Sequence, residues 1–378
     1  MREARTAPFD FFPGAVVNPY KLSEPAQMMQ LYKLELKIAA GARFVITQMG
    51  FNLRKLVELK QYMAREGLGH VPVLANVYVP TATIGRMALS GDLAGCIVPG
   101  ALVQRLAAEK KPERLERAAL MLAAVRELGF AGAHIGGFRL THADFLSILE
   151  RAAAIGSGWR VRMAELVWET PGEFYLLPPG DDGLSDAAGE YQLAGVRRPP
   201  ALKQRASRAA HRWIISRESP VGRFLAGRLE RAAQGAAGSE RWRHGFWYRL
   251  LAPSSLYRKS VLGCMSCGDC IQDHLDYAGC PIRMCYKQLR NGPCGGSRPD
   301  GSCEARPEQP CFWHVVYDGA RSLGDDPRRF ARTLIPPRNW RLDQTNALAN
   351  HFAHIDNAAG RVQLEASPGP ARQEHGTC

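Results

Sequence analysis

Eight of the ten cysteines in this 378-residue chain lie in one short stretch, which limits the possible folds more than any other feature. Several are spaced Cys-x-x-Cys, so two sulfurs of one tight turn can reach the same metal atom. Sets of four thiolates select zinc or iron–sulfur clusters, and eight thiolates make two such sets. We therefore predict two metal centres in a small module. Their expected ligands are Cys264, Cys267, Cys270, Cys280, Cys285, Cys294, Cys303 and Cys311.

The spacing of these cysteines favours two [4Fe–4S] clusters, with two structural zinc ions as the alternative and a mixture as the third possibility. The first three cysteines and the Cys280-Pro281 pair are similar to a bacterial ferredoxin run, but nine residues separate Cys270 from Cys280. The spacing does not assign ligands to centres. Residues 291–296 (NGPCGG) are expected to form a tight turn whose backbone N–H groups point at a sulfur-rich anion.

The N-terminus lacks the basic, apolar and small-residue sequence of a signal peptide, and no stretch of about 18 apolar residues follows. We expect a soluble, cytoplasmic protein with no membrane partner. In a reducing compartment, disulfides are disfavoured and thiolates are free to bind metal. Cys96 stands apart from the module and is expected to be a buried, small hydrophobic residue in an apolar strand.

The net charge of +13 comes almost entirely from residues 197–259, which hold fifteen Lys or Arg against three Glu. Such a run usually forms a solvated helical face. It can also dock an acidic partner or an anionic ligand. Nucleic acid is the third possibility, but no binding motif accompanies the basic residues, so we expect no nucleic-acid partner.

The first 165 residues alternate short apolar runs with helical patterns, as βα units around a parallel sheet do. Helices are expected from Ser23 to Gly41, from Asn52 to Gly67, and over 112–128. About four such units make half of an eight-stranded barrel, and a half-barrel has two open edges that need a partner. Strands are expected at 12–17, 43–47, 71–77, 95–98 and 132–135.

The expected fold class is therefore α/β: the C-terminal half of a (β/α)8 barrel of the TIM type, followed by a small cysteine-rich metal-binding domain. A Pro-, Gly- and Asp-rich stretch over 171–200 suggests a linker between them. The predicted domains are a partial barrel over 1–165, a linker and basic helical segment over 166–258, the cysteine-rich domain over 259–360, and a mobile tail over 361–378.

The cysteine module resembles the C-terminal domain of the methylenetetrahydrofolate reductase family, over about 212–355. The resemblance rests on CMSCGDC, the following Cys-Pro, and NGPCGG. The segment LELKIAAGARFVITQ (34–48) is similar to the second half of the reductase barrel. The resemblance implies reduction of 5,10-methylene-tetrahydrofolate to 5-methyl-tetrahydrofolate by hydride from N5 of a flavin, either FAD or FMN. It also implies a folate substrate and an electron-donor protein or second reductase subunit.

The resemblance assigns roles to four residues. Gln48 matches the glutamine that hydrogen-bonds the pterin, and Lys37 matches a lysine that contacts the flavin; Lys33 and Gln30 occupy neighbouring flavin-contact positions. From the residues alone, Lys37 on a helix is more often solvated. Gln48 ends a predicted strand, where barrel active sites lie. His134 also ends a predicted strand and is either a core histidine or a site residue.

The resemblance implies no catalytic residue in this chain. The family's catalytic glutamate lies on the first barrel strand and its flavin-binding Arg-Gly-Asp on the fourth, and both precede the segment that is similar here. We therefore expect the chain to need the other barrel half, from a second polypeptide or from upstream sequence. The alternative is a non-catalytic iron–sulfur electron-transfer or scaffold subunit. A zinc-stabilised nucleic-acid binder is a third hypothesis.

Overall fold

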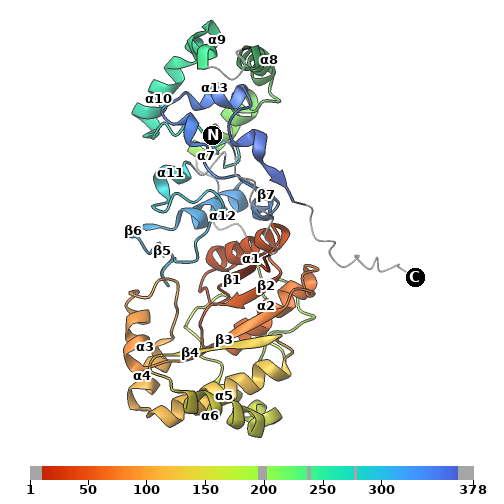
Figure 1. The fold of residues 1–378 in the computed structure, drawn as a ribbon, viewed down its shortest axis with the longest axis vertical. Coiled ribbons are helices and arrows are strands. Elements are labelled where there is room, and N and C mark those ends of the chain that lie inside the picture. Colours follow the sequence, from red (N-terminus) through yellow and green to blue (C-terminus); the bar gives the residue numbers. More distant parts are fainter. Residues whose placement is uncertain (1–10, 195–201, 236–239, 276–278, 365–378) are drawn as a thin grey trace, which may run out of the picture. The chain divides into compact units, whose positions relative to one another are not determined.

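The computed structural model describes residues 11–194, 202–235, 240–275 and 279–364. They form two compact units, 11–192 and 193–364 (Figure 1). Of the predicted tail, residues 365–378 lie outside the described residues. No helix in the described part of the chain is both long and apolar enough to cross a membrane.

The first unit is built on one parallel sheet of four strands in sequential order (Figure 1). Each strand pairs only with its chain neighbours, and β1 and β4 are the edges. Sequential parallel strands joined by helices are the arrangement of a partial (β/α) barrel. The four strands are β1 (Gly14–Val17), β2 (Phe44–Thr47), β3 (Val73–Val79) and β4 (Gly132–Gly137).

The two faces of this sheet differ in burial. On β3, alternate residues beginning at Val73 are buried, whereas Leu74, Asn76 and Tyr78 between them are half-buried. Alternate side chains of a strand point to opposite faces, so one face is covered and the other is partly open. We call the second face the open face of the sheet.

Local signals explain where the helices of the first unit begin. Helix α1 follows Ser23 and has Pro25 in its first turn, and α2 is capped by the Asn52 side chain, which accepts from the Arg54 N–H at 3.1 Å. The sequence predicted these two helices and α5 correctly. The helices are α1 (Glu24–Ala39), α2 (Leu53–Arg65), α3 (Ala82–Leu89), α4 (Gly100–Ala108), α5 (Lys111–Glu127), α6 (His142–Ile155) and the 3-10 helix η1 (Gly156–Glu165).

The strand predicted at 95–98 is wrong. These residues form a loop between α3 and α4, because Gly95 has a φ of +72° and Pro99 ends the stretch after three residues. The neighbouring position on β3 is taken by β4, which leaves no free edge there for a further strand. The Gly95 carbonyl instead accepts from the Asn18 side chain at 2.6 Å, beside the end of β1. Cys96 is therefore a half-buried loop residue, not a strand residue.

Residues 171–192, part of the stretch over 171–200 that the composition suggested as a linker, belong to the first unit. The backbone N–H groups of Leu176 and Leu177 donate to the Glu58 carboxylate on α2 at 2.6 and 3.0 Å. Lys55, also on α2, is fully buried and donates to the Phe174 carbonyl. Polar side chains of α2 thus provide hydrogen-bond partners for the backbone of a segment that forms no helix or strand of its own.

The second unit consists of helices and of strands two to five residues long around the cysteine-rich loops. Before the cysteines come α7 (Leu202–Ala210), the π-helix η2 (His211–Ile215), α8 (Pro220–Gly235), η3 (Glu240–His244), α9 (Phe246–Leu250) and α10 (Ala252–Leu262). Among and after the cysteines come α11 (Pro281–Met284), β5 (Ser302–Cys303), β6 (Arg306–Pro310), α12 (Phe312–Ser322), η4 (Pro327–Ala331), β7 (Thr333–Leu334), η5 (Trp340–Leu342), α13 (Ala347–Phe352), η6 (Asn357–Gly360) and β8 (Val362–Gln363).

Two arginines of the basic segment form ion pairs and hydrogen bonds within the second unit. Arg208 pairs with Asp325 at 2.8 Å. Arg217 pairs with Glu230 and donates to the carbonyls of His351 and Phe352 at 2.8 and 2.9 Å. Arg208 and Arg217 thus bind parts of the unit that lie more than a hundred residues later in the chain. The basic segment therefore does more than form a solvated helical face.

Candidate functional site

Gln48 lies directly after β2, at the carboxyl end of the strand. Its backbone N–H donates to the Val17 carbonyl at 2.7 Å, which continues the pairing with β1, and its side-chain oxygen accepts from the Met49 N–H at 2.9 Å. It is half-buried. By strand alternation it shares the open face with Ile46, and the register places Asn76 and His134 on that face too.

The open face therefore carries polar residues that the sequence did not single out. Asn76 and Tyr78 are half-buried on β3, and the side-chain oxygen of Asn76 has no hydrogen-bond partner in the described structure. The register between β2 and β3, together with the alternation of side chains from Gln48, would have identified both Asn76 and Tyr78. His134 pairs with Asn76 in the middle of β4, not at its end, and is exposed. It is not a core histidine.

Lys37 lies in the last turn of α1 and is bonded to the edge of the sheet. The Pro13 and Val17 carbonyls accept from the β2 side, so the Val16 carbonyl between them points to the unpaired edge of β1. The Lys37 ammonium donates to this carbonyl at 2.5 Å. Burial lowers the pKa of Lys37. A lysine in this position also blunts an exposed strand edge.

Gln30, Lys33 and Lys37 follow one another along one side of α1, at spacings of three and four residues. Gln30 is buried, whereas Lys33 is half-buried. The structure therefore brings the three predicted flavin contacts to one helix, with the two lysines nearer the surface than the glutamine.

The four strands of the first unit supply no carboxylate at their carboxyl ends. The residues that directly follow them are Asn18, Gln48, Pro80 and Phe138. A partly open pocket of about 20 Å³ lies at the open face, lined in part by Phe51, Asn76 and Tyr78. A pocket of that size holds about one water, so a pterin would have to lie over the open face rather than inside the pocket.

We call Cys264, Cys267, Cys270 and Cys280 the first quartet; three of them act on Arg258, and Cys267 is coupled to the other cysteines. The pKa of Arg258 is raised by the charge of Cys270 and further by those of Cys264 and Cys280. Burial raises the pKa of Cys280 to about 11, and the charges of Cys270 and Cys267 add to this rise. These mutual effects put the four thiols in one electrostatic group.

The other four cysteines, Cys285, Cys294, Cys303 and Cys311, form the second quartet. Burial raises the pKa of Cys311 to about 11, and the charges of Cys294 and Cys303 contribute. Burial also raises the pKa of Cys294, with Glu304 and Cys285 adding to it. Cys311 is the N-cap residue of α12, and the N–H groups of Trp313 and His314 in that helix offset part of the rise in its pKa.

Helix α11 joins the two quartets. Cys280 precedes it and belongs to the first quartet, and Cys285 follows it and belongs to the second. At a rise of about 1.5 Å per residue, these two cysteines lie within about 8 Å of each other along the helix. Any two centres held by the quartets would therefore be close neighbours.

Backbone N–H groups point at sulfur in both quartets. Ser266 N–H donates to Cys264 at 3.4 Å, and Gly296 N–H donates to Cys294 at 3.3 Å, within the turn predicted over 291–296. Such N–H···S bonds and an all-thiol donor set suit iron–sulfur clusters or zinc. No three His, Cys, Asp or Glu side chains in the described residues are arranged to hold a metal ion, so the two centres stay a prediction.

Asp269 anchors the loop between Cys267 and Cys270. Its buried carboxylate accepts from the Arg290 side chain, from the Asn339 N–H at 2.8 Å and from the Asn357 N–H at 2.6 Å. Gly268 is required beside it, because its φ is +68° and a Cβ there would lie 1.8 Å from the Leu342 carbonyl.

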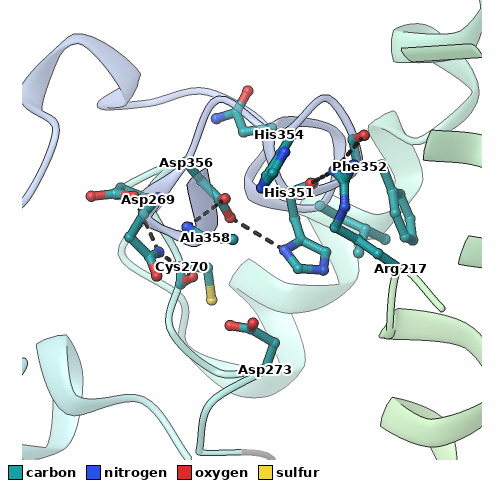
Figure 2. Close-up of polar contacts among 12 residues, drawn as sticks. Arg217, Asp269, Cys270, Asp273, His351, Phe352, His354, Asp356 and Ala358 are labelled. Carbon is teal, nitrogen blue, oxygen red and sulfur yellow. Dashed lines mark hydrogen bonds and ion pairs between the residues drawn. The ribbon is translucent and has the colours of Figure 1, made fainter. Parts of the chain in front are cut away.

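Residues 351–358 lie beside the loop that carries Asp269 and Cys270 and hold it in place (Figure 2). The Asn357 side chain donates to the Cys270 carbonyl at 2.6 Å. Figure 2 shows that segment folded beside the loop, with Asp356 accepting from the Ala358 N–H at 3.0 Å and lying 3.4 Å from His351. Residues far along the chain thus fix the position of Cys270.

We expect acid to destabilise the second unit through His274. Burial, together with the charges of Arg361 and Arg329, lowers its pKa from 6.5 to about 4. Between pH 6.5 and about 4, His274 binds a proton in the unfolded chain but not in the folded chain. The free energy of unfolding should therefore fall by about 1.4 kcal/mol per pH unit between these two values and level off below them.

Urea unfolding of the wild type and of His274→Phe at several pH values measures this effect. Phenylalanine keeps the edge-on packing against Phe330, whose ring centroid lies 5.3 Å away, and removes the titrating group. The slope against pH should be smaller in the variant by about the amount given above. Equal slopes in the two proteins would contradict the assignment to His274.

Comparison with known families agrees with both parts of the chain. A family model described as Methylenetetrahydrofolate reductase matches residues 9–140, and one described as Methylene-tetrahydrofolate reductase C terminal matches residues 251–341. The first range includes the four-stranded sheet, and the second includes all eight cysteines of the quartets. No curated protein and no solved structure matches the chain. The resemblance seen in the sequence is confirmed: residues 9–140 match the methylenetetrahydrofolate reductase family model, and residues 251–341 match the model of its C-terminal domain.

Proposed function

We propose that this chain supplies the folate-binding face and the metal module of a methylenetetrahydrofolate reductase, which forms 5-methyl-tetrahydrofolate from 5,10-methylene-tetrahydrofolate. The observation that carries this proposal is the presence of both family domains on one chain, with Gln48 at the carboxyl end of β2. Active sites of (β/α) barrels lie at that end of the strands.

In this proposal Gln48 binds the pterin ring through its side-chain amide. The amide can donate and accept at once, as the pyrimidine edge of a pterin requires. Asn76, on the same open face, has a buried side-chain oxygen without a partner in the described structure. Two amides on neighbouring strands would fix the orientation of the pterin ring.

The flavin, FAD or FMN, would be held by Lys37 and Lys33, with Gln30 beside them. These residues fit an anionic cofactor, since two cations lie on one side of α1 next to the edge of β1. A bound flavin would supply the hydride for the reduction. A strand paired to β1 would provide an N–H for the Val16 carbonyl and release the Lys37 ammonium to bind the cofactor.

The two quartets would hold two [4Fe–4S] clusters that pass single electrons toward the flavin. Eight thiols with N–H···S bonds at Cys264 and Cys294 support this proposal. Zinc in the same quartets would instead brace a unit made of short elements.

A second candidate function is a non-catalytic electron-transfer or scaffold subunit of such a reductase. The observation that favours it is the lack of a carboxylate at the carboxyl ends of the four described strands, together with the bond between Lys37 and the sheet edge. This candidate keeps the metal centres and predicts no binding of folate or flavin.

Metal analysis and ligand binding on anaerobically purified full-length chain separate the two candidates. We expect bound iron and sulfide, binding of 5-methyl-tetrahydrofolate by calorimetry, and a folate affinity about tenfold lower in Gln48→Ala, equal to about 1.4 kcal/mol. Gln104→Ala on α4 is the matched control, because this glutamine is exposed and lies outside the open face. Iron without folate binding would favour the second candidate. Zinc alone would remove the redox role.

A further inference from the structure

The two quartets differ in the charge beside their sulfurs. The first quartet has a half-buried arginine in direct contact with a sulfur: the Arg258 guanidinium donates to Cys270 at 2.9 Å. Its other bond goes to the neutral amide of Gln272 at 2.5 Å. The positive charge of Arg258 is therefore directed at the cysteines.

The position of Arg258 is fixed by the fold. It lies in the last part of α10, and its backbone carbonyl accepts from the Cys264 N–H at 2.9 Å. Gly263 closes the helix in the left-handed conformation, with φ of +60°, and turns the chain back into the first quartet. The residue that donates to Cys270 thus also holds the backbone of Cys264.

The second quartet has a cation and an anion together. Lys287 pairs with Glu304, and the Glu304 carboxylate lies 3.8 Å from the Cys294 sulfur. The lysine side chain is 46% exposed, so water screens its charge. The charges of Lys287 and Glu304 largely cancel each other. Of the two side chains, the Glu304 carboxylate is the one with a direct contact to a sulfur of this quartet.

We propose that Arg258 is a positioning residue that makes the first centre easier to reduce than the second. This inference rests on the proposed function, since it requires iron–sulfur clusters in both quartets. Reduction of a cluster by one electron adds one negative charge. A half-buried guanidinium bonded to a ligating cysteine sulfur stabilises that charge, and a carboxylate beside a sulfur opposes it. Electrons that enter through the second centre would then move to the first.

The test is a potentiometric titration of the full-length, iron-loaded chain with dithionite, followed by electron paramagnetic resonance of the reduced clusters. In the wild type we expect two reduction steps. Arg258→Gln should shift the first-reduced centre to a lower potential and leave the other step in place. Arg258→Lys, which keeps the charge but loses the planar fork, should recover part of the shift.

Lys287→Gln is the matched control at the second quartet and should lower only the later step, since it leaves Glu304 unpaired. In a Cys294→Ala background, which keeps the first quartet intact, the Arg258→Gln shift should appear on the single remaining signal. Iron bound at both centres with no shift in Arg258→Gln would overturn this inference and leave the proposed function standing. Loss of iron in both Arg258 variants would also overturn it, because Arg258 would then be a folding residue. Absence of iron from the wild type would overturn the proposed function itself.

Discussion

Replacing Cys280 by alanine is expected to remove about half of the bound metal, from about eight irons per chain to about four. Cys285→Ala should do the same, although it lies at the other end of α11. Each variant removes one ligand of a different quartet, and a cluster with three cysteines is lost or labile. Iron and sulfide analysis of anaerobically purified protein measures the effect.

Double variants test the grouping of the cysteines. Cys267→Ala with Cys280→Ala changes the first quartet only, so it should keep about the same iron as either single variant. Cys280→Ala with Cys285→Ala changes both quartets and should keep almost none. Cys96→Ala, outside the module, is the control and should keep all of the iron. Loss of all iron from the first double variant would contradict the two quartets.

The grouping could not be read from the sequence, because spacing does not show which way the chain turns. Cys280 and Cys285 are only five residues apart, a spacing that by itself favours a shared centre. In the structure they lie at opposite ends of α11, and they couple electrostatically to different cysteines, Cys280 to Cys270 and Cys285 to Cys294. The direction of a short helix depends on packing from distant residues, such as Arg290 and Asn357, that hold the loop before it.

The sheet was predicted more fully because its signals are local. Apolar runs and helix caps at Ser23 and Asn52 give four of the five expected strands and the order of the helices. The stretch 95–98 has the same apolar composition as a strand, but Gly95 and Pro99 bound it closely and β4 takes the position beside β3, which composition does not report. Asn76 and Tyr78 on the open face were also missed, because their place there depends on the register between β3 and β4.

The place of Lys37 shows why a family match alone does not settle a ligand site. The residue type and its spacing from Gln48 match the family, yet its ammonium is bonded to the Val16 carbonyl at the edge of β1. A side chain can serve the edge of a sheet or a cofactor, but not both at once. Which one it serves depends on whether β1 is paired, and that is a property of the assembled barrel.

Asp269→Asn is expected to give the largest loss of stability in the second unit, about 3–5 kcal/mol in the free energy of unfolding. The side chain is 2% exposed, and burial alone would raise its pKa. The Arg290 guanidinium and the N–H groups of Asn339 and Asn357 outweigh burial and lower it. Asparagine keeps the shape but leaves Arg290 as a buried charge without its partner.

Asp343→Asn is the control, because Asp343 pairs with Arg338 at a side-chain exposure of 42%. Pairs of that kind contribute about 0–1 kcal/mol. Urea unfolding of the metal-loaded proteins compares the two variants. Since Asp269 lies between Cys267 and Cys270, its variant should also lose metal from the first quartet while the second stays loaded. A loss of stability no larger in Asp269→Asn than in Asp343→Asn would mean that the loop is held by its cysteines alone, and the carboxylate would then have no structural role.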